Sequence, residues 1–319
     1  MRGGRLLLFA GRSHPALAAT IAGRLGVPLG RVELETFTDG EVYCRYAESV
    51  RGADVFLLQS CWPDPNDRLV ELLVMVDAAR LASAHRITAV MPWFPYSRQD
   101  KKLAPREPIS ARLVADLLEA GGVDRVLTMD LHAGQIQGFF HIPVDHMTAL
   151  PLFAEHFRER GLHGGNVVSV SPDLGRVKQA RRVSHMLDCG FAVVAKTRPA
   201  HEVAVAAEVF GDVGGKTALI GDDLVVTGGT LLAAGEALRA AGADGVCAFA
   251  THALFAPGAV EALVGRFEEL AVTDTVPIAP DAAGGLTVLS VAGLLADTIR
   301  NVVADSSVSA IFAGLNELF

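Results

Sequence analysis

Two adjacent carboxylates and a glycine-rich segment lie close together in the second half of the chain. Asp222 and Asp223 follow the aliphatic run from Thr217 to Gly221, and residues 227–230 (Thr-Gly-Gly-Thr) open the next helical segment. Adjacent carboxylates can accept hydrogen bonds from vicinal sugar hydroxyls. The free N–H groups of a helix N-terminus, together with threonine hydroxyls, suit a phosphate. A Gly-Gly pair alone is more typical of a plain strand–helix turn, but the acidic pair before it favours a site for ribose 5-phosphate.

Histidine and aspartate side chains follow two other strand-like runs. Asp130 and His132 come after the run from Arg125 to Met129, and Asp173 comes after the run from Asn166 to Val170. Oxygen-rich ligation with one imidazole suits Mg2+ that is held partly by substrate phosphates. A single histidine is more often an ordinary hydrogen-bonded side chain, and 10 histidines make chance placement easy. On these residues alone, a metal site and a purely structural role both remain open.

Cationic segments follow two further runs. Residues 98–102 (RQDKK) follow the aromatic segment from Trp93 to Tyr96, and Lys196 and Arg198 follow the run from Phe191 to Ala195. Such charge runs are usually solvated loops. A polyphosphate would use them differently, because an arginine can fork onto its oxygens while lysines act as point charges.

A ring and two carboxylates lie together in the segment from Phe37 to Glu41 (FTDGE). The ring can stack on a purine, and the carboxylates can bind it through hydrogen bonds. The same segment equally suits a type I turn at the tip of a hairpin. These residues do not decide between the two interpretations.

All of these groups need a scaffold that brings the ends of separate strands together. Short aliphatic runs alternate with segments of helical periodicity, which predicts parallel sheets with helices returning the chain between successive strands. In such sheets ligands bind beyond the carboxyl ends of the strands, where the polar residues above lie. The predicted strands are Arg5–Ala10, Asp54–Gln59, Ile87–Met91, Arg125–Met129, Asn166–Val170, Phe191–Ala195, Thr217–Gly221 and Gly245–Phe249, and the predicted helices are Asp67–Ala84, Ser110–Ala120 and Thr230–Ala241.

The chain of 319 residues suits two domains, because a domain commonly has about 150 residues. We place the boundary near Thr148, which gives an N-terminal domain of residues 1–148 and a C-terminal domain of residues 149–299. Each is predicted to be an α/β unit with a mainly parallel sheet flanked by helices. The stretch from Val291 to Phe319 has mainly helical character, and residues 300–319 are expected to pack back on the first domain.

The composition excludes several classes of protein. Half of the residues are hydrophobic and 20% are charged, which is typical of a folded protein with large cores. Acidic residues outnumber lysine and arginine by 36 to 28, for a net charge of −8, so we expect no nucleic-acid partner. The four cysteines lie far apart, and no apolar run reaches the ~20 residues that cross a bilayer. We therefore predict a cytoplasmic protein with no membrane partner.

Taken together and in order, these segments resemble the ribose-phosphate diphosphokinases, also called phosphoribosyl pyrophosphate synthetases. The likeness covers essentially the full chain, from residues 7–11 to residues 307–312. The specific stretches are Phe37–Val42 (FTDGEV), Tyr96–Lys101 (YSRQDK), Asp130–Phe140 (DLHAGQIQGFF), Ser171–Asp173, Lys196–Pro199 and Asp222–Thr230.

The resemblance implies two phosphoribosyltransferase-like α/β domains, the first binding ATP and the second binding ribose 5-phosphate. It implies a reaction in which the C1 hydroxyl of ribose 5-phosphate attacks the β-phosphorus of ATP, so that phosphoribosyl diphosphate forms and AMP leaves. Mg2+ is the implied cofactor. Family members commonly form hexamers built from dimers, so a homo-oligomer is implied too, and many members are activated by phosphate and inhibited by ADP.

The resemblance also implies roles for individual residues. The adenine is held by residues of a neighbouring subunit, the rest of ATP by the cationic segment, and the sugar phosphate by the acidic pair and its glycine-rich turn. The implied sets are Phe37, Asp39, Glu41, Arg98 and Gln99 for ATP; Asp222, Asp223, Thr227, Gly228, Gly229 and Thr230 for ribose 5-phosphate; His132 and Asp173 for Mg2+; Lys196 and Arg198 for the transferring diphosphoryl group; and Ser49, Arg51, Gln137, Asp145, Ser307 and Ser309 for a regulatory site.

Four positions depart from the family pattern. Val226 stands where the family normally has a third aspartate, and Arg176 stands where it has the second of two glycines. Thr197 replaces an arginine, and His146 replaces an asparagine. These departures leave open a non-catalytic regulatory relative, a phosphoribosyltransferase that consumes the diphosphate, and a diphosphokinase that acts on another sugar phosphate. The retained Lys196, Arg198 and His132 argue against the non-catalytic relative.

Overall fold

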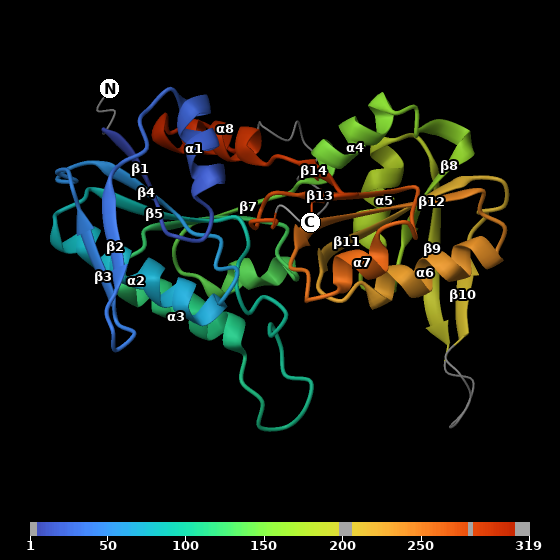
Figure 1. The fold of residues 1–319 in the computed structure, drawn as a ribbon, viewed down its shortest axis with the longest axis horizontal. Coiled ribbons are helices and arrows are strands. Elements are labelled where there is room, and N and C mark those ends of the chain that lie inside the picture. The colour runs from blue at the N-terminus through green and yellow to red at the C-terminus, as the bar shows by residue number, and fades with distance from the viewer. Residues whose placement is uncertain (1–4, 198–205, 280–282, 310–319) are drawn as a thin grey trace.

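Two mainly parallel sheets form the centre of the structure, a computed structural model that describes residues 5–197, 206–279 and 283–309 (Figure 1). The first sheet has five strands in the order β1-β4-β5-β6-β7, all parallel. Its strands are β1 (Leu6–Ala10), β4 (Asp54–Leu58), β5 (Arg86–Met91), β6 (Arg125–Met129) and β7 (Val144–Met147).

The second sheet has seven strands in the order β10-β9-β8-β11-β12-β13-β14, and only the β9–β10 pair is antiparallel. Its strands are β8 (Val167–Ser171), β9 (Gly190–Thr197), β10 (Ala206–Phe210), β11 (Thr217–Val225), β12 (Gly245–Ala253), β13 (Glu269–Thr273) and β14 (Thr287–Leu289). A separate hairpin consists of β2 (Val32–Thr36) and β3 (Val42–Tyr46). The predicted α/β class with mainly parallel sheets is confirmed.

Helices cover both faces of these sheets (Figure 1). One face carries α1 (Pro15–Leu25), α4 (Leu150–Glu159), α5 (Val177–Met186) and α8 (Ala292–Val303), and the other carries α2 (Pro65–Leu81), α3 (Ser110–Gly121), α6 (Gly229–Ala240) and α7 (Ala259–Leu263). Short 3-10 turns occupy Gly134–Phe139 and Gly164–Asn166. Helices α8 and α1 pack together, and Leu295 and Ile299 of α8 are fully buried. No helix among the described residues is long and apolar enough to cross a membrane.

Strand β11 is longer than the sequence predicts. The prediction ends it at Gly221 because two charged residues follow, but the strand continues to Val225 and contains both Asp222 and Asp223. It continues because β12 pairs with it as far as Ala253, which lies opposite Val225. The acidic pair is therefore held in regular strand backbone and not in a loop.

The sequence prediction missed β2, β3, β7, β10, β13 and β14. Strands β2 and β3 carry no fully buried residue, so their hydrophobic patterns are weak, and β7 and β14 have only four and three residues. The predicted helices are right in type, and their ends differ by at most three residues, as for α2 (Pro65–Leu81 against Asp67–Ala84). The domain boundaries at 148 and 299 stay predictions, and residues 310–319 lie outside the described residues.

Gly221 offers a test of how the acidic pair is supported, because β11 passes directly over the buried ring of Phe249 at this residue. A Cβ at Gly221 would overlap that ring. The ring has no room to move, since its centroid lies 4.9 Å from that of Phe153 and 5.7 Å from that of Phe157. We expect Gly221→Ala to destabilise the protein by about 1–3 kcal/mol, measured as a fall of several degrees in the melting temperature.

The matched control for this substitution is Gly165→Ala. Gly165 is exposed, and an added Cβ there would have no neighbour within 4 Å. Its melting temperature should stay within about a degree of the wild type, since surface substitutions of this kind usually change stability by less than about 0.5 kcal/mol. Equal melting temperatures for the two variants would contradict the packing argument.

Candidate active site

One cavity of about 250 Å3 collects polar residues from both sheets. Its walls come from the loop after β5, from the segments after β6 and β8, and from the end of β11 with the turn into α6. The lining residues include Arg98, His132, Asp173, Arg176, Asp222, Asp223, Val226, Thr227, Gly228, Gly229 and Thr230. The structure therefore brings together the predicted metal ligands, the sugar-phosphate residues and one predicted ATP-binding residue.

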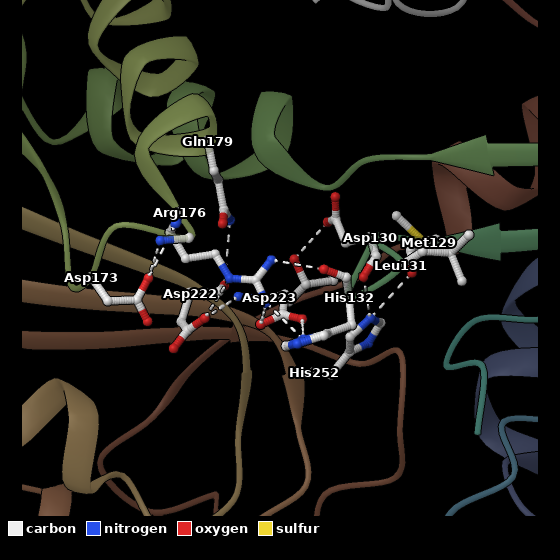
Figure 2. A network of polar contacts seen from close by, with 12 residues as sticks. Met129, Asp130, Leu131, His132, Asp173, Arg176, Gln179, Asp222, Asp223 and His252 are labelled. Atoms are coloured by element: carbon white, nitrogen blue, oxygen red, sulfur yellow. Dashed lines mark hydrogen bonds and ion pairs between the residues drawn. The ribbon is translucent and has the colours of Figure 1, made fainter. Parts of the chain in front are cut away.

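The acidic pair and the histidine line this cavity and lie close together in one network of polar contacts (Figure 2). His132 Nδ1 lies 2.7 Å from Asp223 Oδ2, so a hydrogen on Nδ1 is donated to that carboxylate. The backbone N–H of Asp223 donates to Asp222 Oδ1 over 2.8 Å. Only about 5% of the Asp223 side chain is exposed, against 14% for Asp222. Two nearly buried carboxylates are thus adjacent, an arrangement that requires positive charge nearby.

Arg176 supplies that positive charge. Its Nη2 lies 2.6 Å from Asp223 Oδ1, and its Nε lies 3.2 Å from Asp222 Oδ1. Nη2 is also 2.8 Å from His132 Nδ1, and Nη1 donates to the carbonyl oxygen of His132 over 3.3 Å. Figure 2 shows the guanidinium between the two aspartates and the histidine. Sequence reasoning noted Arg176 only as a departure from the family pattern, although its place three residues after Asp173 was a usable signal.

The surroundings move the two carboxyl groups in opposite directions. Burial raises the pKa of Asp222, and the neighbouring Asp223 raises it further. Burial also acts to raise the pKa of Asp223, but the hydrogen bond from His132 and the charge of Arg176 outweigh it, so this pKa is lowered. Negative charge therefore resides on Asp223 in preference to Asp222.

Contacts between the two sheets hold this region in place. Asp130 follows β6 with a φ of 35°, in the left-handed region that few residues other than glycine adopt. Its Oδ2 accepts hydrogen bonds from Thr251 Oγ1 over 2.6 Å and from the Ala149 N–H over 2.9 Å. The buried His252 of β12 places Nε2 3.2 Å from the Met129 carbonyl oxygen. The backbone leading to His132 is thus tied to the second sheet.

A larger cavity of about 860 Å3 continues from the first, and the two share Arg98, His132, Asp173, Arg176 and Asp223. Cationic side chains from the loop after β5, from the turn before α5 and from α5 itself line it: Arg98, Lys101, Arg176, Lys178 and Arg182. The α5 residues were missed from the sequence, because their exposure to a cavity is decided by how α5 packs. A surface with this many cations suits a polyphosphate.

The turn into α6 carries the predicted phosphate-binding residues. Gly228 has a φ of 76°, and a Cβ there would lie 2.7 Å from side-chain carbons of Leu263, so glycine is required. Helix α6 begins at Gly229, and its first N–H groups have no side-chain cap. Thr227, Gly229 and Thr230 are at least partly accessible from the cavity. These groups can bind a phosphate.

The predicted adenine-binding residues lie elsewhere. Phe37, Asp39 and Glu41 belong to the turn between β2 and β3, so the hairpin interpretation of this segment is confirmed as its local structure. About 49% of Phe37 is exposed. Glu41 lines a separate cavity of about 590 Å3 that shares no residue with the two described above. Gln99 lines neither the 250 Å3 nor the 860 Å3 cavity, and its Oε1 accepts a hydrogen bond from Ser110 over 2.6 Å.

Of the two predicted catalytic cations, Lys196 and Arg198, the structure describes the backbone of Lys196. The backbone of Lys196 lies in β9, opposite Ala207 of β10, and not in the loop that the sequence predicts. The strand runs past Val193, which pairs with Ser171 at the end of β8, so Lys196 is at the same sheet edge as Asp173. Arg198 lies outside the described residues.

The predicted regulatory residues come from three separate segments of the chain. No hydrogen bond or ion pair among the described residues links the groups at residues 49–51, 137–145 and 307–309. Their contacts are local: Asp145 forms an ion pair of 2.6 Å with Arg125, and the hydroxyl groups of Ser307 and Ser309 share a hydrogen bond of 2.8 Å. The full predicted set, Ser49, Arg51, Gln137, Asp145, Ser307 and Ser309, stays a prediction.

Mg2+ fits the donor set at the edge of the cavity. Among the described residues, no group of three or more histidine, cysteine or acidic side chains forms a ready-made metal site. Mg2+ usually takes only one or two protein carboxylates and completes its shell with water and substrate phosphates. The Nδ1 atom of His132 faces Asp223, an arrangement that is typical of histidines whose Nε2 atom binds a metal ion. Asp173 lines the same cavity and can supply an oxygen ligand.

Comparisons with known proteins agree over nearly the whole chain. Residues 6–122 match the family described as the N-terminal domain of ribose phosphate pyrophosphokinase, and residues 175–313 match the phosphoribosyl synthetase-associated domain. The chain is 49% identical over 311 residues to a ribose-phosphate pyrophosphokinase of Nostoc sp., covering 97% of this chain and 94% of that one. It is 47% identical over 311 residues to the chloroplastic ribose-phosphate pyrophosphokinase 2 of Spinacia oleracea, covering 97% and 79%.

A solved structure shows the same agreement in three dimensions. The crystal structure of phosphoribosylpyrophosphate synthetase from Mycobacterium smegmatis superposes with a TM-score of 0.89 at 46% sequence identity. The match covers 95% of this chain and 100% of that chain.

Proposed function

The chain belongs to the ribose-phosphate pyrophosphokinase family, and from this premise we propose how its residues carry out the reaction. It is a ribose-phosphate diphosphokinase, which transfers the β,γ-diphosphoryl group of ATP to the C1 hydroxyl of ribose 5-phosphate and releases AMP. The relatives favour this activity over a non-catalytic role. One observation supports the residue assignments most directly: side chains from both sheets line one cavity.

The sugar phosphate is bound at the end of β11. Asp222 and Asp223 accept hydrogen bonds from the ribose hydroxyls, and the turn from Thr227 to Thr230 binds the 5-phosphate through its N–H groups and hydroxyls. Because the carboxylates are in strand backbone and the phosphate site is at a helix start, the sugar is fixed at two ends. This orientation directs the C1 hydroxyl toward the larger cavity, where the nucleotide phosphates bind.

The nucleotide phosphates are bound by cations of the larger cavity. Arg98 and Lys101 contribute from the loop after β5, and Lys178 and Arg182 contribute from α5. Lys196 and Arg198 neutralise the charge that develops on the transferring group. Phosphoryl transfer needs in-line positioning and neutralisation of charge more than a covalent nucleophile, so a cavity rich in cations is sufficient chemistry.

Mg2+ is the proposed cofactor, and His132 and Asp173 would hold it together with the phosphates of ATP. When bound, it draws charge from the phosphate oxygens and so makes the β-phosphorus more open to attack. The protein's part is to fix the ligands: Asp223 orients His132, and Asp173 is held by the N–H groups of Gly175 and Arg176 at 2.8 and 3.2 Å.

The adenine is bound between subunits in this proposal. The β2–β3 turn with Phe37, Asp39 and Glu41 lines none of the cavity that holds Arg98 and His132, so these residues serve the site of a neighbouring copy. A homo-oligomer, at least a dimer, is therefore part of the proposal. A cytoplasmic location stays a prediction, as one relative is named as chloroplastic.

Asp222→Asn tests the sugar site. Asparagine keeps the shape but replaces one carboxyl oxygen, which can accept a hydrogen bond from a sugar hydroxyl, with an NH2 group, and leaving a buried partner without its hydrogen bond costs roughly 1–3 kcal/mol. We expect the KM for ribose 5-phosphate to rise by about 10- to 100-fold with little change in the KM for ATP, assayed by formation of AMP and phosphoribosyl diphosphate. Asp244→Asn, at an exposed residue, is the control. A comparable rise in the KM for ATP would contradict the assignment.

Lys196→Ala tests the role of the cation at the end of β9. If Lys196 acts on the charge of the transition state, kcat should fall by about 10²- to 10³-fold while the KM for ATP changes little. Lys216→Ala is the control, because Lys216 pairs with Asp212 in a turn outside the cavities. Equal losses in kcat and in ATP affinity would show that Lys196 serves binding in general.

Subunit complementation tests the shared adenine site. Phe37→Ala and Asp223→Asn should each be nearly inactive, but oligomers that contain both variants form some sites with an intact turn from one chain and an intact cavity from the other. We expect co-expressed, doubly tagged mixed oligomers to recover part of the wild-type rate. Mixed oligomers no more active than the separate variants would place Phe37 in the site of its own chain.

A further inference from the structure

Arg176 occupies the centre of the acidic cluster that lines the cavity. Its guanidinium contacts Asp222 and Asp223, and its Nη1 donates a hydrogen bond to the carbonyl oxygen of His132 over 3.3 Å (Figure 2). Only 15% of its side chain is exposed. A cation that makes three such contacts while nearly buried is a component of the site and not a solvated surface residue.

The backbone around Arg176 is fixed as well. Asp173 Oδ1 accepts hydrogen bonds from the N–H of Gly175 over 2.8 Å and from the N–H of Arg176 over 3.2 Å. Helix α5 begins at the next residue, Val177. The side chain therefore projects from a short, tethered turn, which holds the guanidinium against the acidic pair.

Most oxygens of the pair are already engaged by this arrangement. Asp222 Oδ1 accepts a hydrogen bond from the Asp223 N–H and forms an ion pair with Arg176 Nε. Asp223 Oδ1 forms an ion pair with Arg176 Nη2, and Asp223 Oδ2 faces His132. Within the described residues, only Asp222 Oδ2 has no such contact. Val226, on the same wall, adds no further carboxylate.

We propose that Arg176 is the resident cation of this cluster, taking the position in which a divalent metal ion would otherwise bind the carboxylates of Asp222 and Asp223. Two adjacent carboxylates are donors that a divalent ion accepts, with water completing its shell. Arginine stays charged at any physiological pH and has planar donors that match carboxylates, so it neutralises the pair permanently. Divalent cations then enter this cavity only on the Asp173 side, together with a phosphate-bearing substrate.

The inference concerns the cavity of the proposed function but does not depend on its substrates, because metal binding can be measured without ATP or sugar. Mn2+ alone is the probe, and free Mn2+ is followed by its electron paramagnetic resonance signal. Arg176→Ala should gain one Mn2+ site with an affinity about 10-fold or more above that of any site in the wild type, a scale typical of changed metal surroundings.

Two further variants localise the effect. Arg181→Ala removes the same charge from an exposed residue of α5 and should bind Mn2+ like the wild type. The double variant Arg176→Ala/Asp223→Asn should lose the gained site. Equal Mn2+ binding by the wild type and Arg176→Ala, or a gained site that persists without Asp223, would overturn the proposal.

A stability readout covers the case in which Arg176→Ala folds poorly. Unpaired buried carboxylates destabilise a protein, and a metal ion that binds only the folded state stabilises it. Mg2+ should therefore raise the melting temperature of Arg176→Ala, and of the larger Arg176→Gln, by several degrees more than that of the wild type. Arg176→Lys, which keeps the charge, should respond like the wild type. Identical Mg2+ responses in all of these proteins would also overturn the proposal.

Discussion

Two adjacent, nearly buried carboxylates are the constraint on which the site depends. Asp222 and Asp223 repel each other, and burial removes the water that would otherwise solvate them. Strand pairing with β12 nevertheless holds both in regular backbone. The surroundings resolve this conflict by placing Arg176 and His132 against the pair, which lowers the pKa of Asp223 and leaves that of Asp222 raised.

The same cluster links the two halves of the molecule. His132 comes from the first sheet, whereas Arg176 and the aspartates come from the second, so the ion pairs form only when the carboxyl ends of the two sheets face each other (Figure 1). Contacts behind the cavity fix that arrangement, above all Thr251 and the buried His252 against the backbone around Asp130. The proposed active site thus lies where the sheets meet.

The chain belongs to a family of diphosphokinases, yet its site has its own charge distribution. Val226 offers an apolar wall, and Arg176 adds a positive charge. The two features act in the same direction, because each makes the sugar end of the cavity less negative. An arginine that pairs permanently with the acids differs from a metal ion, which can exchange ligands and leave with the product.

The sequence alone determined the α/β class, eight of the strands and the chemical groups at their ends, because hydrophobic periodicity and polar residues after strands are local signals. It did not extend β11 through Asp222 and Asp223, since pairing with a distant strand outweighs the local preference against buried charge. It also marked Arg176 only as a departure. Whether an arginine three residues after Asp173 faces solvent or two carboxylates depends on how α5 and β11 pack together, and only the tertiary structure decides that.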